Sequence, residues 1–102
     1  MKDLKLEVFK TPLEKRRGLL NRKKIGVHEL FLFPGVNTIH THGMKFPIKV
    51  IFVDSKADII SIVLMKPGQE YKEPGAAAAI ECHPFFNSAN LHELKEKIIK
   101  TL

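Results

Sequence analysis

Residues 39–54, IHTHGMKFPIKVIFVD, join a short polar segment with two histidines to a long apolar run. The part from 48 to 54 predicts a buried strand, because apolar residues occupy both faces between Val50 and Val53. Gly43 interrupts the pattern ahead of this strand, which is typical of a bulge or a bend. The sequence therefore places a central strand directly behind an irregular loop.

Further short strands are expected on both sides of this run. Apolar and charged residues alternate over 4–8, and the other predicted strands are 27–33, 38–42, 59–65 and 76–83. The last of these contains four alanines that favour a helix, but prolines bound it to the length of a strand. Asp54 and Asp58 flank the loop at 55–58 and suit the turn of a hairpin.

Two helices are expected, one near each end. Thr11 and Glu14 have the spacing of a capping box, and Pro12 suits the first helical position. The expected buried stripe of this helix is Leu13, Leu19 and Leu20. A second capping box, Asn90 with Glu93, precedes an amphipathic helix whose expected apolar face is Leu91, Leu94, Ile98, Ile99 and Leu102. Short strands with helices at their edges predict a mainly β, α+β domain.

Length and composition predict one domain over residues 1–102. A chain of this size buries about 65% of its unfolded surface, and 44% hydrophobic residues with seven Phe can form a core. No apolar stretch approaches the roughly 20 residues that span a membrane, and the N-terminus lacks the apolar segment of a secretion signal. Cys82 is the single cysteine, so no internal disulfide is possible. These features predict a cytoplasmic protein without a membrane partner, and abundant Lys, Glu and Ile weakly favour a thermophilic source.

The net charge of +6 is concentrated in the first quarter of the chain. Residues 1–24 hold nine basic and three acidic groups, whereas the rest holds eight of each. A positive patch of this kind attracts phosphates and acidic partners. The candidates for binding nucleic acid or another polyanion are Arg16, Arg17, Arg22, Lys23 and Lys24. The alternative is an ordinary solvated surface, because no aromatic residues are interleaved with these cations.

Two blocks of the sequence resemble a known family. TPLEKRRGLL at 11–20 and IHTHGMKFPIKVIFVD at 39–54 are similar to the two conserved blocks of domain of unknown function 192. The resemblance covers roughly residues 5–83, and it implies a compact β-sandwich or a partly closed barrel with a short N-terminal helix. It implies no settled activity.

Three departures from the family pattern stand out. Lys15 lies where the family usually has Arg, and Lys49 replaces a carboxylate that the family tends to place after Pro-Ile. The segment AIECHPFFNSAN replaces a block of the form Leu-Glu-Leu-Pro-Ala-Gly. If the carboxylate of the second block performs chemistry elsewhere in the family, this protein has lost it.

Four residues have the spacing of metal ligands. His40 and His42 are two apart, as are Glu81 and His83, so each pair projects from one face of a strand. If all four converged, they would suit Zn or Fe. A cupin-type site needs a Glu shortly after the second His, but Phe46 follows instead, and the resembled family has Phe in place of His42. We therefore expect solvated histidines and no cofactor.

Motifs for nucleophilic catalysis are not apparent in the sequence. Cys82 is expected to pack beside Ile80, because adjacent strand residues point to opposite faces and His83 cannot activate it. The irregular loop would instead form a cleft around His40, Met44 and Phe46, although the last two are as readily core residues. The sequence thus predicts an accessory module that binds a small molecule or a protein partner. Polyanion binding is the alternative, and a metal-dependent enzyme is less favoured.

Overall fold

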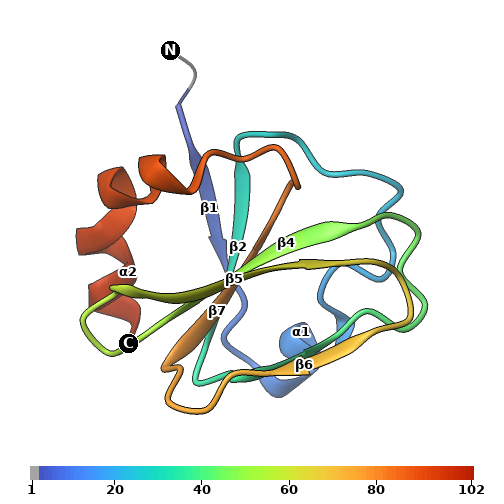
Figure 1. Cartoon of the computed structure of the whole chain (residues 1–102), viewed down its shortest axis with the longest axis horizontal. Coiled ribbons are helices and arrows are strands. Elements are labelled where there is room, and N and C mark those ends of the chain that lie inside the picture. The colour runs from blue at the N-terminus through green and yellow to red at the C-terminus, as the bar shows by residue number, and fades with distance from the viewer. Residues whose placement is uncertain (1–2) are drawn as a thin grey trace.

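The computed structural model describes residues 3–102, without the side chain of Arg16, and is shown in Figure 1. Its elements are β1 (Lys5–Val8), α1 (Pro12–Arg17), β2 (Glu29–Pro34), β3 (Thr38–His40), β4 (Ile48–Val53), β5 (Ile59–Met65), β6 (Glu70–Lys72), β7 (Ala78–Cys82), the 3₁₀ helix η1 (Ser88–Leu94) and α2 (Lys95–Thr101). Five strands form one sheet in the order β1-β2-β7-β4-β5, and β3 pairs with β6 in a second sheet. The pairing is antiparallel except between β1 and β2.

The two faces of the larger sheet carry two separate cores. On one face, residues of β2, β4 and β7 pack against η1 and α2 through Leu91, Leu94 and Ile98. On the other face, the segment after α1 and the β3–β6 pair cover the sheet. The Phe52 and Tyr71 rings lie 5.6 Å apart and join the two sheets on this second face. The mainly β, α+β fold is confirmed, and the two sheets do not close into a barrel.

The first capping box forms as the sequence predicts. The Thr11 hydroxyl accepts a hydrogen bond from the Glu14 backbone N–H at 3.1 Å, and Glu14 Oε1 accepts one from the Thr11 N–H at 2.9 Å. A further N–H donor, from Lys10, lies 3.0 Å from the same oxygen. The backbone donors of Thr11 and Lys10 hold the pKa of Glu14 below its ordinary value.

The predicted strands are confirmed at 4–8, 27–33, 38–42, 48–54, 59–65 and 76–83. The bounds of β5 are those predicted, β2 begins two residues later and ends one residue later, and the other strands are shorter by one to three residues. The hairpin turn is confirmed as well, since Asp54 Oδ1 accepts from the N–H groups of Lys56 and Asp58 at 2.9 and 3.0 Å. Cys82 is fully buried in the same core as Ile80, as expected. The three-residue β6 was not predicted, because its sequence, EYK, is short and polar and lacks the apolar pattern of a strand.

Both predicted helical stripes need correction. Leu13 is 55% exposed, because α1 ends at Arg17 and the buried leucine, Leu19, belongs to the turn that follows. The C-terminal segment is capped by Asn87 and not by Asn90, with Asn87 Oδ1 accepting from the Ala89 N–H. It begins as a 3₁₀ helix of three residues per turn, so a stripe drawn with a period of 3.6 drifts off its face. Ile99 and Leu102 consequently remain exposed.

Within residues 3–102, no helix has the length and apolar character needed to cross a bilayer.

Candidate functional site

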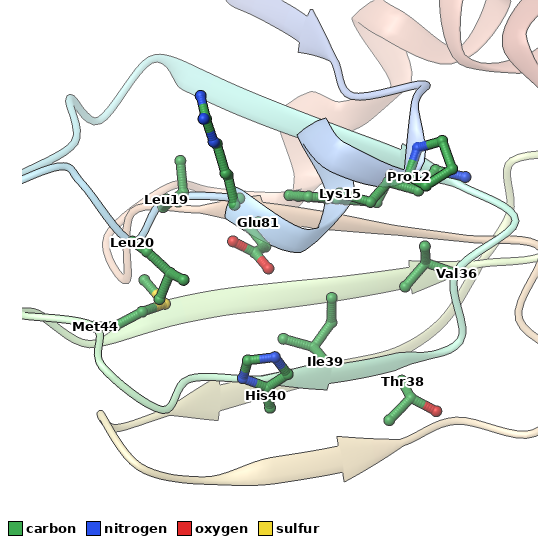
Figure 2. A pocket seen from close by; sticks show the side chains of 13 residues that line it. Pro12, Lys15, Leu19, Leu20, Val36, Thr38, Ile39, His40, Met44 and Glu81 are labelled. Carbon is green, nitrogen blue, oxygen red and sulfur yellow. The ribbon is translucent and has the colours of Figure 1, made fainter.

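A pocket of about 280 Å³ lies between α1 and the larger sheet (Figure 2). Helix α1 and the turn after it form one wall, and β3 with the segment before it forms the opposite wall. Strand β7 contributes a single side chain to the pocket. The lining residues are Pro12, Lys15, Arg17, Gly18, Leu19, Leu20, Phe33, Val36, Thr38, Ile39, His40, Met44 and Glu81.

The position of α1 over the sheet depends on two local contacts. Lys15 Nζ donates a hydrogen bond to the Pro34 carbonyl oxygen at 2.5 Å, which ties the helix to the end of β2. Gly18 ends the helix at a φ of +47°, and a Cβ there would lie 3.7 Å from the Phe33 ring. Because glycine adopts a positive φ without steric cost, the chain can turn here and bring Leu19 into the core.

Glu81 is the buried carboxyl group of this pocket. It lies in β7, between β2 and β4, where Phe31 and Val50 are its partners in the two neighbouring strands. The residue is only 5% exposed, and its Oε1 atom has no hydrogen-bond partner among the described residues. Burial raises its pKa to about 8. At neutral pH the carboxyl group is therefore mainly protonated and can both donate and accept a hydrogen bond.

His40 contributes an imidazole ring to the lining of the pocket. Figure 2 shows it on the β3 side, across the pocket from the Glu81 carboxyl group. Its ring stacks on that of His42 at 5.5 Å between centroids. Between them, Thr41 is fully buried, and its hydroxyl accepts from the Gln69 N–H at 2.9 Å and donates to the Lys66 carbonyl oxygen. This anchor fixes the end of β3 and sets the position of both rings.

The four candidate metal ligands do not converge. Glu81 and His40 share the pocket, but His83 follows the end of β7 and lines a different groove. His83 Nδ1 accepts from the Phe85 N–H at 3.0 Å, so it belongs to the turn in which the chain leaves the strand. The sequence placed His83 and Glu81 on one face of a strand, but β7 ends at Cys82, so His83 does not follow the alternation of the strand. Across the described residues, no group of three or more His, Cys, Asp or Glu could hold a metal ion.

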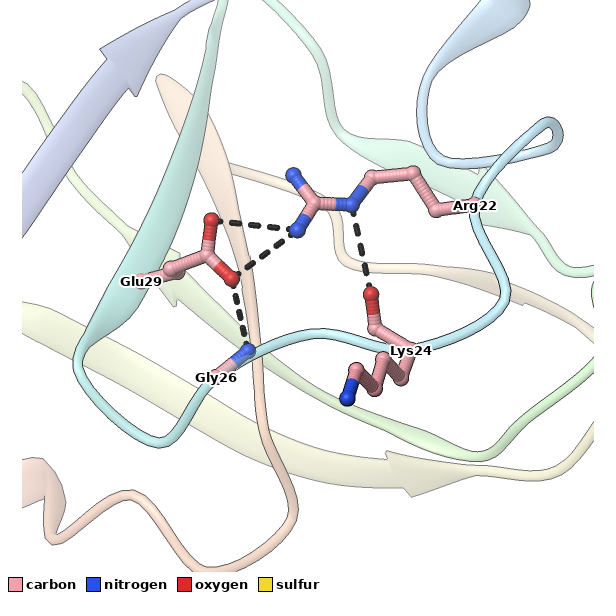
Figure 3. A network of polar contacts seen from close by, with 4 residues as sticks. All are labelled: Arg22, Lys24, Gly26 and Glu29. Atoms are coloured by element: carbon pink, nitrogen blue, oxygen red, sulfur yellow. Dashed lines mark hydrogen bonds and ion pairs between the residues drawn. The ribbon is translucent and has the colours of Figure 1, made fainter.

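Arg22 belongs to a local network and not to an open cationic surface (Figure 3). Its Nη2 atom donates to both Glu29 oxygens, at 2.9 and 3.1 Å, and its Nε donates to the Lys24 carbonyl oxygen at 3.2 Å. The guanidinium carbon also lies 5.2 Å from the centre of the Phe31 ring. The Gly26 N–H, together with Arg22, holds the pKa of Glu29 below its ordinary value. The network fixes the loop between α1 and β2.

The other predicted binding residues are distributed over different parts of the surface. Arg17 lines the pocket, Lys24 lines the groove that contains His83, and Lys23 is exposed. Arg16 cannot be placed, because its side chain lies outside the described residues. Of the predicted cleft residues, Met44 is buried in the wall of the pocket, whereas Phe46 lines the other groove.

Several residues of the pocket were not predicted, among them Lys15, Val36 and Thr38. The capping box at Thr11 predicted the helix α1, but not that α1 forms a wall of the pocket. That arrangement depends on the contact between α1 and β2, which are distant in the sequence. Lys49, where the resembled family tends to have a carboxylate, lies on the other face of the sheet. Its Nζ donates to the Phe86 carbonyl oxygen at 2.7 Å, so this departure leaves the pocket unchanged.

The comparison with known families agrees with this architecture. The family model for DUF192, described as "Uncharacterized ACR", matches residues 1–92. The chain belongs to the DUF192 family. A search of curated proteins finds no match.

Two solved structures share the fold of this DUF192 member. A protein of unknown function from Novosphingobium aromaticivorans DSM 12444 is 21% identical, with a TM-score of 0.69 over 90% of this chain and 70% of that one. A protein described as a "putative transcription regulator" from Sinorhizobium meliloti 1021 is 19% identical, with a TM-score of 0.70 over 89% and 74% of the two chains. At these identities the likeness shows the fold alone.

Proposed function

We propose that this DUF192 protein is a module that binds a small molecule in the pocket between α1 and β7. The observation that carries the proposal is the Glu81 carboxyl group, which is 5% exposed, lines the pocket and has an oxygen without a partner in the described chain. A buried polar group without a hydrogen bond costs roughly 1–3 kcal/mol. A ligand that supplies the missing hydrogen bond removes this cost, so binding is favoured at this position.

The lining of the pocket indicates the class of ligand. Leu19, Leu20 and Met44 offer an apolar wall, and the protonated Glu81 matches a hydroxyl or amide group. Lys15 and Arg17 are the charged cations of the lining, and no ionised carboxylate opposes them. They favour a negative group on the ligand. The proposed ligand is therefore a small organic acid with a hydroxyl group, of a size suited to about 280 Å³.

A thermal-shift panel tests this proposal. The panel contains hydroxy acids, sugar acids and sugar phosphates, each with an uncharged analogue. A ligand that binds only the folded state raises the melting temperature by mass action. We expect at least one acid to raise it, and we expect Glu81→Leu, which removes both hydrogen-bonding atoms, or Arg17→Ala to weaken the affinity about tenfold, as the loss of roughly 1.4 kcal/mol requires. The exposed Lys23→Ala serves as the control and should leave the affinity unchanged.

Two results would contradict the pocket proposal. One is that no compound of the panel changes the melting temperature. The other is a ligand whose affinity is the same for the Glu81→Leu variant and for the wild type, since that ligand would bind elsewhere on the molecule.

Polyanion binding through the basic N-terminal quarter is the alternative proposal. Its remaining candidates are Arg17, Lys23 and Lys24, which lie on different parts of the surface, and Arg22 is already paired with Glu29. RNA and heparin at two salt concentrations extend the panel. A stabilisation that disappears at high salt and is insensitive to Glu81→Leu would favour this alternative. For either function we propose a cytoplasmic location, because the single cysteine gives no disulfide to an oxidising compartment.

A further inference from the structure

Strand β5 forms one edge of the larger sheet and has an unusual composition. Its sequence, IISIVLM, contains no charged residue and no proline. Ile60, Ile62 and Leu64 are 41%, 46% and 60% exposed. Within the part of the chain that the structure describes, these residues make no hydrogen bond beyond their pairing with β4. The outer edge of β5 therefore presents free backbone groups and apolar side chains to solvent.

An edge of this kind is normally protected. Monomeric proteins blunt edge strands with lysines, prolines or bulges, because an open edge is a template for pairing with another strand. The irregularity in β5 lies opposite Phe52 and Val53, near its beginning, and the register from Ser61 to Met65 is regular. The regular part of β5 is thus free of the features that prevent pairing.

An apolar groove continues the exposed surface beyond the strand. Leu64 and Phe85 line a groove of about 470 Å³ that also includes Phe46 and Pro84. Phe85 is 82% exposed, which is high for an aromatic side chain. Because Leu64 belongs to both the strand and the groove, the edge and the groove are continuous, and the mainly apolar lining of the groove also includes Lys24 and Lys66.

We propose that β5 pairs antiparallel with β5 of a second copy of this chain, joining two five-stranded sheets across a two-fold axis. The net charge of +6 on each copy opposes association, so a second copy can approach closely only through a surface without basic groups, and β5 is uncharged. A two-fold axis brings the same strand of both copies together, so both β5 edges are paired and β1 remains the outer edge of each sheet. The inference is independent of the pocket proposal.

The available area is consistent with a dimer. The exposed parts of Ile60, Ile62, Leu64 and Phe85 amount to roughly 400 Å² on each copy, taking on the order of 200 Å² for a large apolar residue. Two copies therefore bury roughly 800 Å² through these side chains alone. The backbone edge and the flanking residues bring the total close to the ~1,000 Å² of a specific interface.

Light scattering coupled to size-exclusion chromatography, over a range of protein concentrations, tests this inference. We expect the wild type to elute with about twice the 11.6 kDa mass of one chain. Ile62→Lys and Leu64→Lys each place a charge on the strand and should raise the dimer dissociation constant at least tenfold. Both residues are exposed, so the variants should retain the circular dichroism spectrum of the wild type. Ile99→Lys is the matched control. Ile99 lies in α2 and is 43% exposed, and this variant should remain dimeric.

Three outcomes would overturn the inference. A wild type that is monomeric at every concentration excludes the dimer. A dimer that persists in both folded β5 variants assigns the interface elsewhere. A dimer that only Ile99→Lys dissociates assigns it to α2.

Discussion

The Glu81→Gln variant is expected to be more stable than the wild type at pH 8, by on the order of 4 kcal/mol. In the folded protein burial raises the pKa of Glu81 to about 8, whereas the unfolded chain releases this proton near the ordinary value of 4.5. Between these two values unfolding releases a proton, so stability falls as the pH rises, by about 1.4 kcal/mol per unit. Because the amide of Gln does not titrate, the variant does not lose this stability as the pH rises.

The sign of the effect follows from the proton balance. Below pH 4.5 both states of the wild type hold the proton, and the variant should differ little from it. Above pH 8 both states are ionised, and the penalty of a buried charge is complete. Urea denaturation at several pH values measures the free energy of unfolding across this range. We expect a falling curve for the wild type and a flatter one for Glu81→Gln.

The exposed Glu70 provides the matched control for this measurement. Glu70→Gln makes the same chemical change outside the core, and it should alter stability by less than about 0.5 kcal/mol. If Glu81→Gln is less stable than the wild type at pH 8, or if its pH profile keeps the slope of the wild type, the carboxyl group is not the buried and unpaired group described here.

The Phe33→Ala variant is expected to lose about 3–4 kcal/mol of stability. Phe33 is 2% exposed, its ring meets Phe9 edge-on at 4.9 Å between centroids, and it lies beneath Gly18 where α1 ends. Removing the ring leaves a cavity on the floor of the pocket and takes away the surface on which α1 rests. The loss should therefore extend to ligand affinity as well as to stability.

Phe85→Ala is the control for this prediction. The same ring is removed at a residue that is 82% exposed, and the free energy of unfolding should change by less than about 0.5 kcal/mol. Urea denaturation of both variants, each made in the Ile62→Lys background so that contacts of Phe85 between two copies do not contribute, provides the comparison. Equal losses from Phe33→Ala and Phe85→Ala would contradict the core position of Phe33.

The parts of the fold that depend on neighbouring residues were predictable from the sequence. The capping box of Thr11 and Glu14 and the turn at Asp54 are made within a few residues, and both form as expected. Leu13 shows the limit of such reasoning. The helix ends after six residues because Gly18 adopts a positive φ and the chain turns toward Phe33, which is a contact between distant segments. The sequence pattern alone identified the buried Leu19 and wrongly added Leu13 to the same stripe.

The candidate site was predictable only in part, for the same physical reason. The spacing of Glu81 and His83 suggested a shared face, but the pocket arises where α1 and β3 lie over Glu81, the second-last residue of β7, and His83 lies beyond the end of the strand. His40, Met44 and Arg17 were candidates and do line the pocket. The isolation of the Glu81 carboxyl group could not be inferred, because it depends on which groups other strands bring near it.

The most direct test of this account is a pH titration of the Glu81 side-chain carboxyl carbon by NMR, with Glu81→Gln used to assign the signal. The account predicts a midpoint near pH 8, as burial without a protein partner requires. A midpoint near 4.5 would contradict it. In that case the carboxyl group is solvated or paired, and the pocket offers no unsatisfied group to a ligand.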